Sequence, residues 1–187
     1  FGNLCSESNI YLMEQTTSLY KFLKENYDSL TGSEFLDKQC KLGSYNKDGI
    51  RNEDATNLSF KSNSLDLVAS FDVFEHIPNF IDAFKECNRV LKDSGSMIFS
   101  VPFNPKSDTN IIRSQLKKDG SIEHLMKPQY HGDPIIKKGI LCFQDFGWEV
   151  LENLKNVGFA SAYVIAGSSI PLANFGTQLI IVANKNN

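Results

Sequence analysis

Short apolar runs alternate along the chain with helical patterns, and this alternation limits the possible folds more than any other feature. The clearest run, residues 65–70, is apolar at nearly every position. Such a run is typical of a strand that is covered on both faces. Strands that alternate with helices indicate parallel pairs joined by helical crossovers. We therefore predict an α/β fold with a mostly parallel sheet between layers of helices.

The expected elements can be placed from apolar spacing and from turn residues. Helices are predicted after a threonine cap in the run 15–17, from Pro78 to Gly95, and from Trp148 to Gly158. The sheet is expected to have about seven strands, which is an ordinary number. The predicted strands are residues 10–14, 29–34, 49–54, 65–70, 96–101, 160–166 and 177–183.

Length and composition narrow the class of protein. The 187 residues are 41% hydrophobic and 22% charged, which suits one globular domain over residues 1–187. The net charge is −3 without a basic block, so we expect no nucleic-acid partner. No apolar stretch approaches the roughly 20 residues of a membrane span, so none is predicted. The chain begins with Phe1 rather than Met, as a fragment of a longer product does.

The cysteines and histidines argue against a metal site or a disulfide framework. Four cysteines lie 35, 47 and 55 residues apart and form no CxxC pair. His124 and His131 are seven residues apart without a helical framework, so no metal ion is predicted. We predict mostly buried, reduced thiols and a cytoplasmic location.

Carboxylates follow four of the expected strands: Glu14, Glu34, Asp54 and Asp72, at intervals of 20, 20 and 18 residues. Ligands of open α/β sheets bind outside the carboxyl ends of the strands. A carboxylate after the second strand can accept both ribose hydroxyls of a nucleoside, so Glu34 is the candidate for that contact. Asp54 can accept a bond from an adenine amine, with the backbone of Ala55 meeting the ring. The spacing therefore predicts a nucleoside-containing cofactor.

Three blocks carry a family resemblance: NEDATNLSF at 52–60, SLDLVASFDVFEHI at 64–77 and RVLKDSGSMIFSVP at 89–102. As a set they resemble the S-adenosylmethionine-dependent methyltransferases of the Rossmann-like class, in particular the type 11 group. The resemblance covers roughly residues 10–102 and extends more weakly to the end. It implies a three-layer sandwich with strand order 3-2-1-4-5-7-6, the last strand antiparallel, and S-adenosyl-L-methionine as cofactor.

The resemblance also implies roles for single residues. Glu34 would hold the ribose, Asp54 and Ala55 the adenine, and Phe71 with Asp72 would line the cofactor cleft. Glu14 has the position of the acid in the family's first motif, where it either contacts the cofactor or orients the turn.

The chain departs from the family at the turn after the first strand, because residues 14–18 contain no glycine. We expect the hydroxyls of Thr16 and Thr17 to contact either the methionyl carboxylate of the cofactor or the helix amides.

The function expected is methyl transfer to an oxygen, nitrogen or carbon of a small-molecule acceptor. His76 and His131 are the candidate bases, with His124 as a third. A segment at 103–144 is expected to cap the site as an insert, with Tyr130, His131 and Asp133 contacting the substrate.

Two other functions stay open at this point. One is a binding or scaffolding module that has kept the fold and lost the cofactor, which the glycine-free turn favours. The other is a nicotinamide-dependent oxidoreductase, which ranks low because the glycine fingerprint that it needs is missing. Cofactor binding separates the first alternative from the enzyme.

Overall fold

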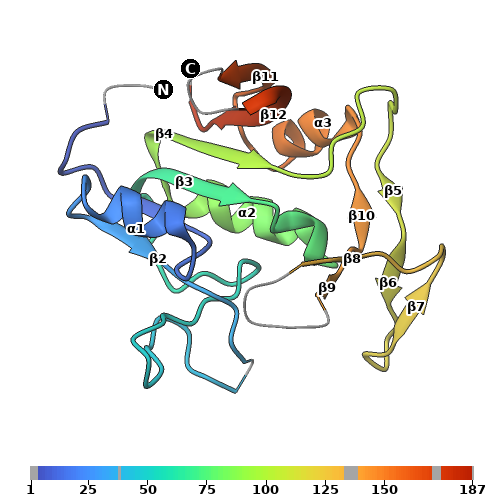
Figure 1. Ribbon diagram of the computed structural model, residues 1–187, viewed down its shortest axis with the longest axis horizontal. Coiled ribbons are helices and arrows are strands. Elements are labelled where there is room, and N and C mark those ends of the chain that lie inside the picture. The colour runs from blue at the N-terminus through green and yellow to red at the C-terminus, as the bar shows by residue number, and fades with distance from the viewer. Residues whose placement is uncertain (1–3, 38, 133–138, 170–173, 187) are drawn as a thin grey trace.

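The computed structural model describes residues 4–37, 39–132, 139–169 and 174–186. Within these ranges six strands form one main sheet in the order β11-β12-β4-β3-β1-β2 (Figure 1). The strands β1 to β4 run parallel, and β12 is antiparallel to both of its neighbours. The predicted α/β fold with an antiparallel last strand is confirmed. The strands are β1 Ile10–Leu12, β2 Leu30–Gly32, β3 Leu65–Phe71, β4 Leu91–Ser100, β11 Ser161–Ser169 and β12 Asn174–Asn184.

The prediction of seven strands was wrong for this sheet, because the strand expected at 49–54 is reduced to two isolated bridges. Glu34 pairs in parallel with Asn52, and Tyr45 pairs antiparallel with Arg51. Side chains take up the backbone groups that a ladder would use. The Asn46 side chain accepts bonds from the amides of Asp48 and Ile50 and so folds the segment into a turn. The Asn52 side chain likewise bonds to the backbone of a neighbouring loop rather than extending a strand.

Among the described residues, three α-helices and a short 3₁₀ turn accompany the sheet. The Thr17 hydroxyl caps the first helix by accepting a bond from the amide of Tyr20 at 3.1 Å. No helix within the described ranges is long and apolar enough to cross a membrane. The helical elements are α1 Ser18–Lys24, η1 Phe74–His76, α2 Phe80–Val90 and α3 Glu149–Asn156.

The helix predicted to reach Gly95 ends earlier, at Val90, and β4 begins at the next residue. An irregularity in the β3–β4 pairing absorbs the intervening residues, because Leu65 pairs with Leu91 while Leu67 already pairs with Ser96. Gly95 is required there, since a Cβ atom would lie 2.9 Å from the carbonyl oxygen of Lys92. Glycine therefore serves a bulge in the strand and not the end of the helix.

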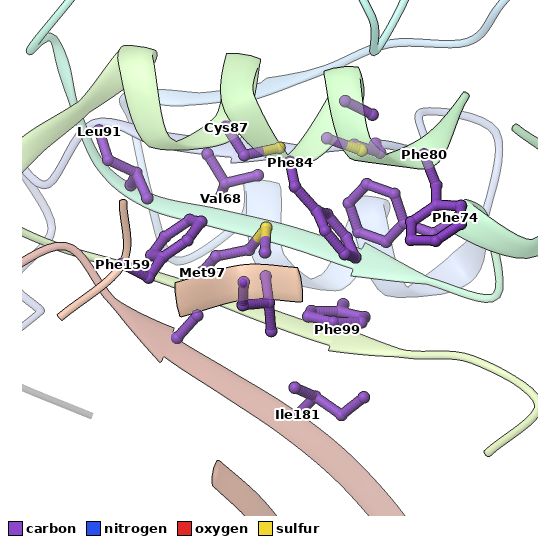
Figure 2. Packing of buried hydrophobic residues seen from close by; sticks show 14 of the residues in the cluster. Val68, Phe74, Phe80, Phe84, Cys87, Leu91, Met97, Phe99, Phe159 and Ile181 are labelled. Carbon is purple, nitrogen blue, oxygen red and sulfur yellow. The ribbon is translucent and has the colours of Figure 1, made fainter. Parts of the chain in front are cut away.

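The two faces of the sheet bury separate apolar clusters, as the alternation of side chains along a strand requires. One face packs against α1, and the other packs against α2 and α3. Figure 2 shows Val68, Met97 and Phe99 of the sheet facing the α2 side chains. Phe74 packs edge-on against Phe84 and Phe99, with ring centroids 4.9 and 5.1 Å apart. The turn η1 is thereby anchored in the main core.

Between residues 111 and 145, the part that the structure describes (111–132 and 139–145) forms three small antiparallel pairs beyond the carboxyl ends of β3 and β4 (Figure 1). They occupy the stretch expected to cap the site, and Asp133 lies outside the described residues. The pairs are β5 Ile111–Ile112 with β10 Gln144–Asp145, β6 Ser114–Leu116 with β7 Ile122–His124, and β8 Tyr130–His131 with β9 Ile140–Leu141.

All four cysteines are free thiols, but they divide evenly in exposure. Cys87 and Cys142 are buried, whereas Cys5 and Cys40 are exposed. The prediction that the thiols are mostly buried therefore holds for only two of them.

Candidate active site

Three of the four predicted carboxylates meet at one rim of the sheet: Glu14 after β1, Glu34 after β2 and Asp72 after β3. We call these three residues the carboxylate rim. Burial, together with the negative charges of Glu34 and Asp72, raises the pKa of Glu14 to about 7. A hydrogen bond with Thr17 acts in the opposite direction. The three groups are therefore close enough to interact, as the strand spacing predicts.

Glu34 organises the glycine-free turn. Its Oε1 atom accepts three bonds, from the amides of Gln15 and Thr16 at 2.8 and 2.9 Å and from the Thr16 hydroxyl at 2.9 Å. The Thr16 hydroxyl thus points to Glu34, and the Thr17 hydroxyl caps α1. The protein itself therefore uses both of the hydroxyls that were candidates for the methionyl carboxylate.

A glycine does allow two backbone segments to approach closely at this rim. This glycine is Gly32 at the end of β2, and not a residue of the turn after β1. A Cβ atom on Gly32 would lie 2.7 Å from the carbonyl oxygen of Glu14 and 2.5 Å from the Tyr20 ring. Any larger residue would push the turn after β1 away from β2. Sequence reasoning missed this position because it searched for glycine in the turn itself. The available signal was the run Leu-Thr-Gly-Ser-Glu at 30–34.

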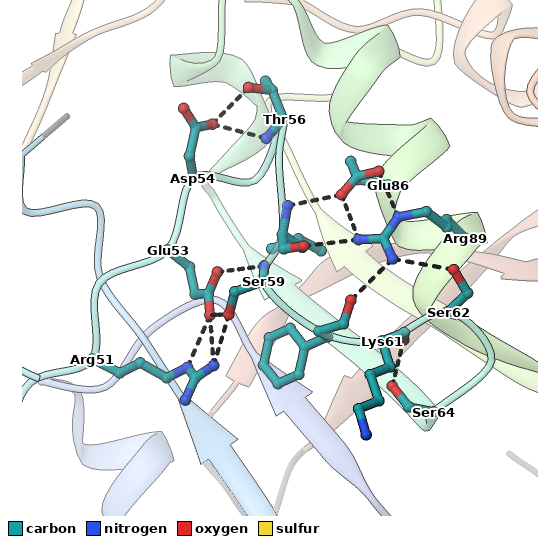
Figure 3. A network of polar contacts seen from close by, with 12 residues as sticks. Arg51, Glu53, Asp54, Thr56, Ser59, Lys61, Ser62, Ser64, Glu86 and Arg89 are labelled. Carbon is teal, nitrogen blue, oxygen red and sulfur yellow. Dashed lines mark hydrogen bonds and ion pairs between the residues drawn. The ribbon is translucent and has the colours of Figure 1, made fainter. Parts of the chain in front are cut away.

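Asp54 lies in a loop that polar contacts hold in place (Figure 3). Its Oδ1 atom accepts bonds from the amide and hydroxyl of Thr56 at 2.9 and 2.7 Å. The neighbouring Glu53 is buried and pairs with Arg51 at 2.8 Å. Ala55 is partly buried against the main core. Residues 54 and 55 therefore have a defined backbone at the position where contact with an adenine is predicted.

The end of β3 turns sharply at Asp72, which has a φ of 54°. This left-handed conformation is uncommon for residues other than glycine, although Asp tolerates it. The Ser100 hydroxyl donates to Asp72 Oδ1 at 2.9 Å, and the Asp72 amide donates to the Ser100 carbonyl at 3.1 Å. Phe71 is partly buried and packs against the apolar cluster that faces α1. β4 thus fixes the direction in which Asp72 leaves β3.

A second group of titratable residues, Glu75, His76 and His131, gathers at η1, and we call it the Glu–His cluster. The Nδ1 atom of His131 lies 3.2 Å from Glu75 Oε1, and the Nε2 atom of His76 lies 3.7 Å from the same oxygen. The two imidazole rings meet edge-on with centroids 5.2 Å apart. The structure therefore brings the two predicted bases together around a carboxylate that sequence reasoning did not single out.

Segments far apart in the sequence position this cluster. The Phe143 amide donates to the Glu75 carbonyl at 2.7 Å, and His76 Nδ1 bonds to the Leu141 carbonyl at 2.9 Å. The buried Gln144 amide donates to the carbonyls of Phe74 and Ile77 at 2.6 and 3.0 Å. β9, β10 and the residues between them therefore hold η1 in place.

Glu75 is the unusual member, because its side chain is fully buried at 0% exposure. Burial raises its pKa to about 8, and the charges of Asp72 and Asp145 contribute in the same direction. Its Oε2 atom has no hydrogen-bond partner within the part of the chain that the structure describes. A signal was present in the sequence, since Glu75 is an acid inside the otherwise apolar approach to His76.

The other candidates lie apart from the cluster. Tyr130 is 56% exposed at the start of the β8–β9 pair. His124 is exposed in the β6–β7 pair, where its Nδ1 atom bonds to the Ser114 hydroxyl at 2.9 Å. Among the described cap residues that were predicted to take part in the chemistry, His131 is thus the one that reaches η1.

The chain is similar to known proteins in part of its sequence and in its fold. Residues 15–99 match the family model described as a methyltransferase domain. No curated protein is significantly similar to the chain.

The fold is shared with solved methyltransferase structures at low sequence identity. A putative S-adenosylmethionine-dependent methyltransferase from Listeria monocytogenes is 14% identical with a TM-score of 0.57, over 98% of this chain and 94% of that one. One from Mesorhizobium loti is 13% identical with a TM-score of 0.58, over 96% and 93% of the two chains. The phosphoethanolamine N-methyltransferase 2 of Haemonchus contortus, solved with S-adenosylhomocysteine, is 13% identical with a TM-score of 0.58, over 100% of this chain and 51% of its own.

These structures establish the fold, and the family model covers the β1 turn through most of β4, which includes the whole carboxylate rim except Glu14. Residues 15–99 therefore match a methyltransferase domain, and the chain shares its fold with S-adenosylmethionine-dependent methyltransferases.

Proposed function

We propose that the chain transfers a methyl group to an oxygen, nitrogen or carbon atom of a small-molecule acceptor. The observation that carries the proposal is the carboxylate rim, where acids from three neighbouring strands interact at the carboxyl ends of the sheet. S-adenosyl-L-methionine supplies an electrophilic methyl group on a positively charged sulfonium. A rim of negative charge suits such a cofactor.

In this proposal, different residues contact different parts of the cofactor. Glu34 holds the ribose through its second oxygen, Oε2, since Oε1 is bound to the turn. Asp54 and Ala55 hold the adenine, and Asp54 Oδ2 is the acceptor because Oδ1 is bound to Thr56. Glu14, Phe71 and Asp72 line the cleft.

Thr16 and Thr17 act indirectly, as positioning residues. Thr16 is tied to Glu34 and Thr17 starts α1, so together they hold the turn that the cofactor meets. Gly32 lets that turn approach β2.

The acceptor is expected beside His76 and His131. Methyl transfer requires a nucleophile held in line with the methyl carbon in a site that excludes water. His76 is fixed by the Leu141 carbonyl, and His131 by Glu75, so both rings have set orientations. We propose that these two residues contact the reacting group of the acceptor, while Tyr130 and Asp133 contact the rest of the molecule.

The wider setting is also proposed here. We propose one domain over residues 1–187 in which residues 103–144 are the insert that carries His131 and covers the acceptor. We further propose a cytoplasmic location and no nucleic-acid partner, on the basis of the free thiols and the net charge of −3.

Calorimetric titration of S-adenosylhomocysteine into the purified chain tests the cofactor assignment, with NAD as the control ligand. We expect Asp54→Ala to weaken binding about tenfold, which corresponds to about 1.4 kcal/mol for one lost hydrogen bond. Asp119→Ala is a matched control, because Asp119 Oδ1 accepts the same pair of bonds from Ser121 in the distant β6–β7 turn. A folded wild-type chain that does not bind S-adenosylhomocysteine would overturn the proposal.

A further inference from the structure

We propose that Glu75, His76 and His131 bind one divalent transition-metal ion of the Zn²⁺ type. This site is separate from the carboxylate rim and uses residues from two parts of the chain, η1 and β8. The three ligand atoms lie within 4.8 Å of one another.

The ligand types select the class of ion. Two imidazole nitrogens and one carboxylate oxygen suit Zn²⁺ and its transition-metal neighbours, whereas Mg²⁺ and Ca²⁺ prefer oxygen ligands. Bonds of about 2.0–2.1 Å in a tetrahedron place neighbouring ligand atoms about 3.3 Å apart. The distances from Glu75 Oε1 to His131 Nδ1 and His76 Nε2, 3.2 and 3.7 Å, are close to that value. The third distance, between the ligand nitrogens of His76 and His131, is at most 4.8 Å. It therefore exceeds the tetrahedral value by at most about 1.5 Å.

The hydrogen bond of His76 sets the tautomer that a metal ligand needs. A carbonyl oxygen can only accept, so the bond to Leu141 places the proton of a neutral His76 ring on Nδ1. The lone pair is then on Nε2, the nitrogen that faces Glu75. A ring N–H bonded to a backbone carbonyl is the usual outer-shell support of a histidine that binds metal.

Gln129 can provide the same support to His131. Its side-chain amide lies 3.1 Å from His131 Nε2. With its oxygen turned to that nitrogen, the amide accepts the Nε2 proton and leaves the lone pair on Nδ1, toward Glu75. Gln129 is exposed, so this half-turn of the amide meets no packing.

Charge gives the second and independent reason for an ion. Glu75 is fully buried and its Oε2 atom has no hydrogen-bond partner among the described residues. A buried carboxylate without a compensating positive charge is costly. Arg113 does not supply that charge, because it is already paired with the nearby acid Asp145 at 2.7 Å. A divalent ion bound by Glu75 Oε1 at the cluster would supply the missing positive charge.

The role of the ion rests on the proposed function. An ion here would bind an oxygen of the acceptor and lower the pKa of an acceptor hydroxyl, so that His76 and His131 would act on the reacting group through the ion. Binding of the ion itself requires neither acceptor nor cofactor, so the two proposals can be tested apart.

Zn²⁺ titrated calorimetrically into the chelator-treated chain, without cofactor, is the direct test. The background carries Cys5→Ser and Cys40→Ser, because these two exposed thiols could bind Zn²⁺ on their own. We expect one equivalent of Zn²⁺ to bind, and at least tenfold weaker binding in His131→Ala. His124→Ala is the matched control, since His124 lies in the same stretch but outside the cluster.

Co²⁺ in place of Zn²⁺ gives a spectroscopic readout of the ligands. We expect visible absorption that is lost in His131→Ala and in Glu75→Gln, with folding of each variant checked by circular dichroism. A folded parent chain that does not bind Zn²⁺, or binding that His131→Ala leaves unchanged, would overturn the proposal. Zn²⁺ binding without S-adenosylhomocysteine binding would support the metal site while contradicting the proposed function.

Discussion

The carboxylate rim and the Glu–His cluster both lie at the carboxyl ends of the strands, but they are built differently. The rim acids each follow their own strand and are held by neighbours in the adjacent turn, as Glu34 is by Gln15 and Thr16. The cluster depends on β9 and β10, which lie 65 to 70 residues away from η1 in the sequence. It also rests on Phe74, which is part of the main core.

Because of this difference, the rim and the cluster should contribute differently to the free energy of unfolding. Changes at the rim should alter cofactor binding while leaving the fold intact. Changes that undermine the cluster should lower the free energy of unfolding, because the cluster and the core share η1. Four variants test the contrast.

Phe74→Ala should lower the free energy of unfolding by about 3–5 kcal/mol, because it removes a fully buried ring and leaves a cavity. Denaturant unfolding measures this effect. Phe22→Ala is the control, since Phe22 is 62% exposed and should change stability by less than about 0.5 kcal/mol. Equal effects in the two variants would contradict the anchoring of η1 in the core.

Gln144→Ala should destabilise the chain by about 1–3 kcal/mol, because two buried carbonyls lose their donor. The matched control is Gln115→Ala, whose amide bonds only to the side chain of Glu123 at the surface. Denaturant unfolding again measures both variants. An unchanged free energy of unfolding in Gln144→Ala would show that β10 does not hold η1 in place.

Glu34→Ala should act on binding more than on stability. We expect about tenfold weaker S-adenosylhomocysteine binding, or about 1.4 kcal/mol, because three bonds that shape the turn are lost. The free energy of unfolding should change by less than about 1 kcal/mol at this partly exposed site. Calorimetry and denaturant unfolding of one sample separate the two quantities. A loss of stability as large as that of Phe74→Ala would remove the contrast between rim and cluster.

Glu14 should make cofactor affinity depend on pH. Its raised pKa of about 7 means that the carboxylate, which attracts the positive cofactor, is present above that pH and is lost below it. S-adenosylhomocysteine still carries an ammonium group, so we expect its affinity to fall a few-fold between pH 8 and pH 6. Glu14→Gln should bind with no such trend, and a trend that persists in this variant would assign the titration to another group.

The same pKa shift has the opposite effect on stability. The unfolded carboxyl ionises near its ordinary value of 4.5, whereas the folded one holds its proton to about 7. Stability contributed by the protonated group is therefore lost as the pH rises through that window.

Much of the fold was predictable because its signals are local. A nearly continuous apolar run located β3, and a threonine before apolar residues at helical spacing marked the start of α1. The strand expected at 49–54 was a wrong prediction, because the side chains of Asn46 and Asn52 compete with the ladder for backbone groups. The end of α2 was also misplaced, because Gly95 serves a bulge that exists only where β4 pairs with β3.

The sequence alone was sufficient to place acids at the carboxyl ends of successive strands, since strand spacing repeats along the chain. It could not reveal that Glu75 is fully buried or that His131 meets it across 56 residues. Those properties arise only when β8, β9 and β10 fold onto η1. Burial and the proximity of charges depend on distances through space. The Glu–His cluster and the raised pKa of Glu75 therefore arise from the tertiary structure.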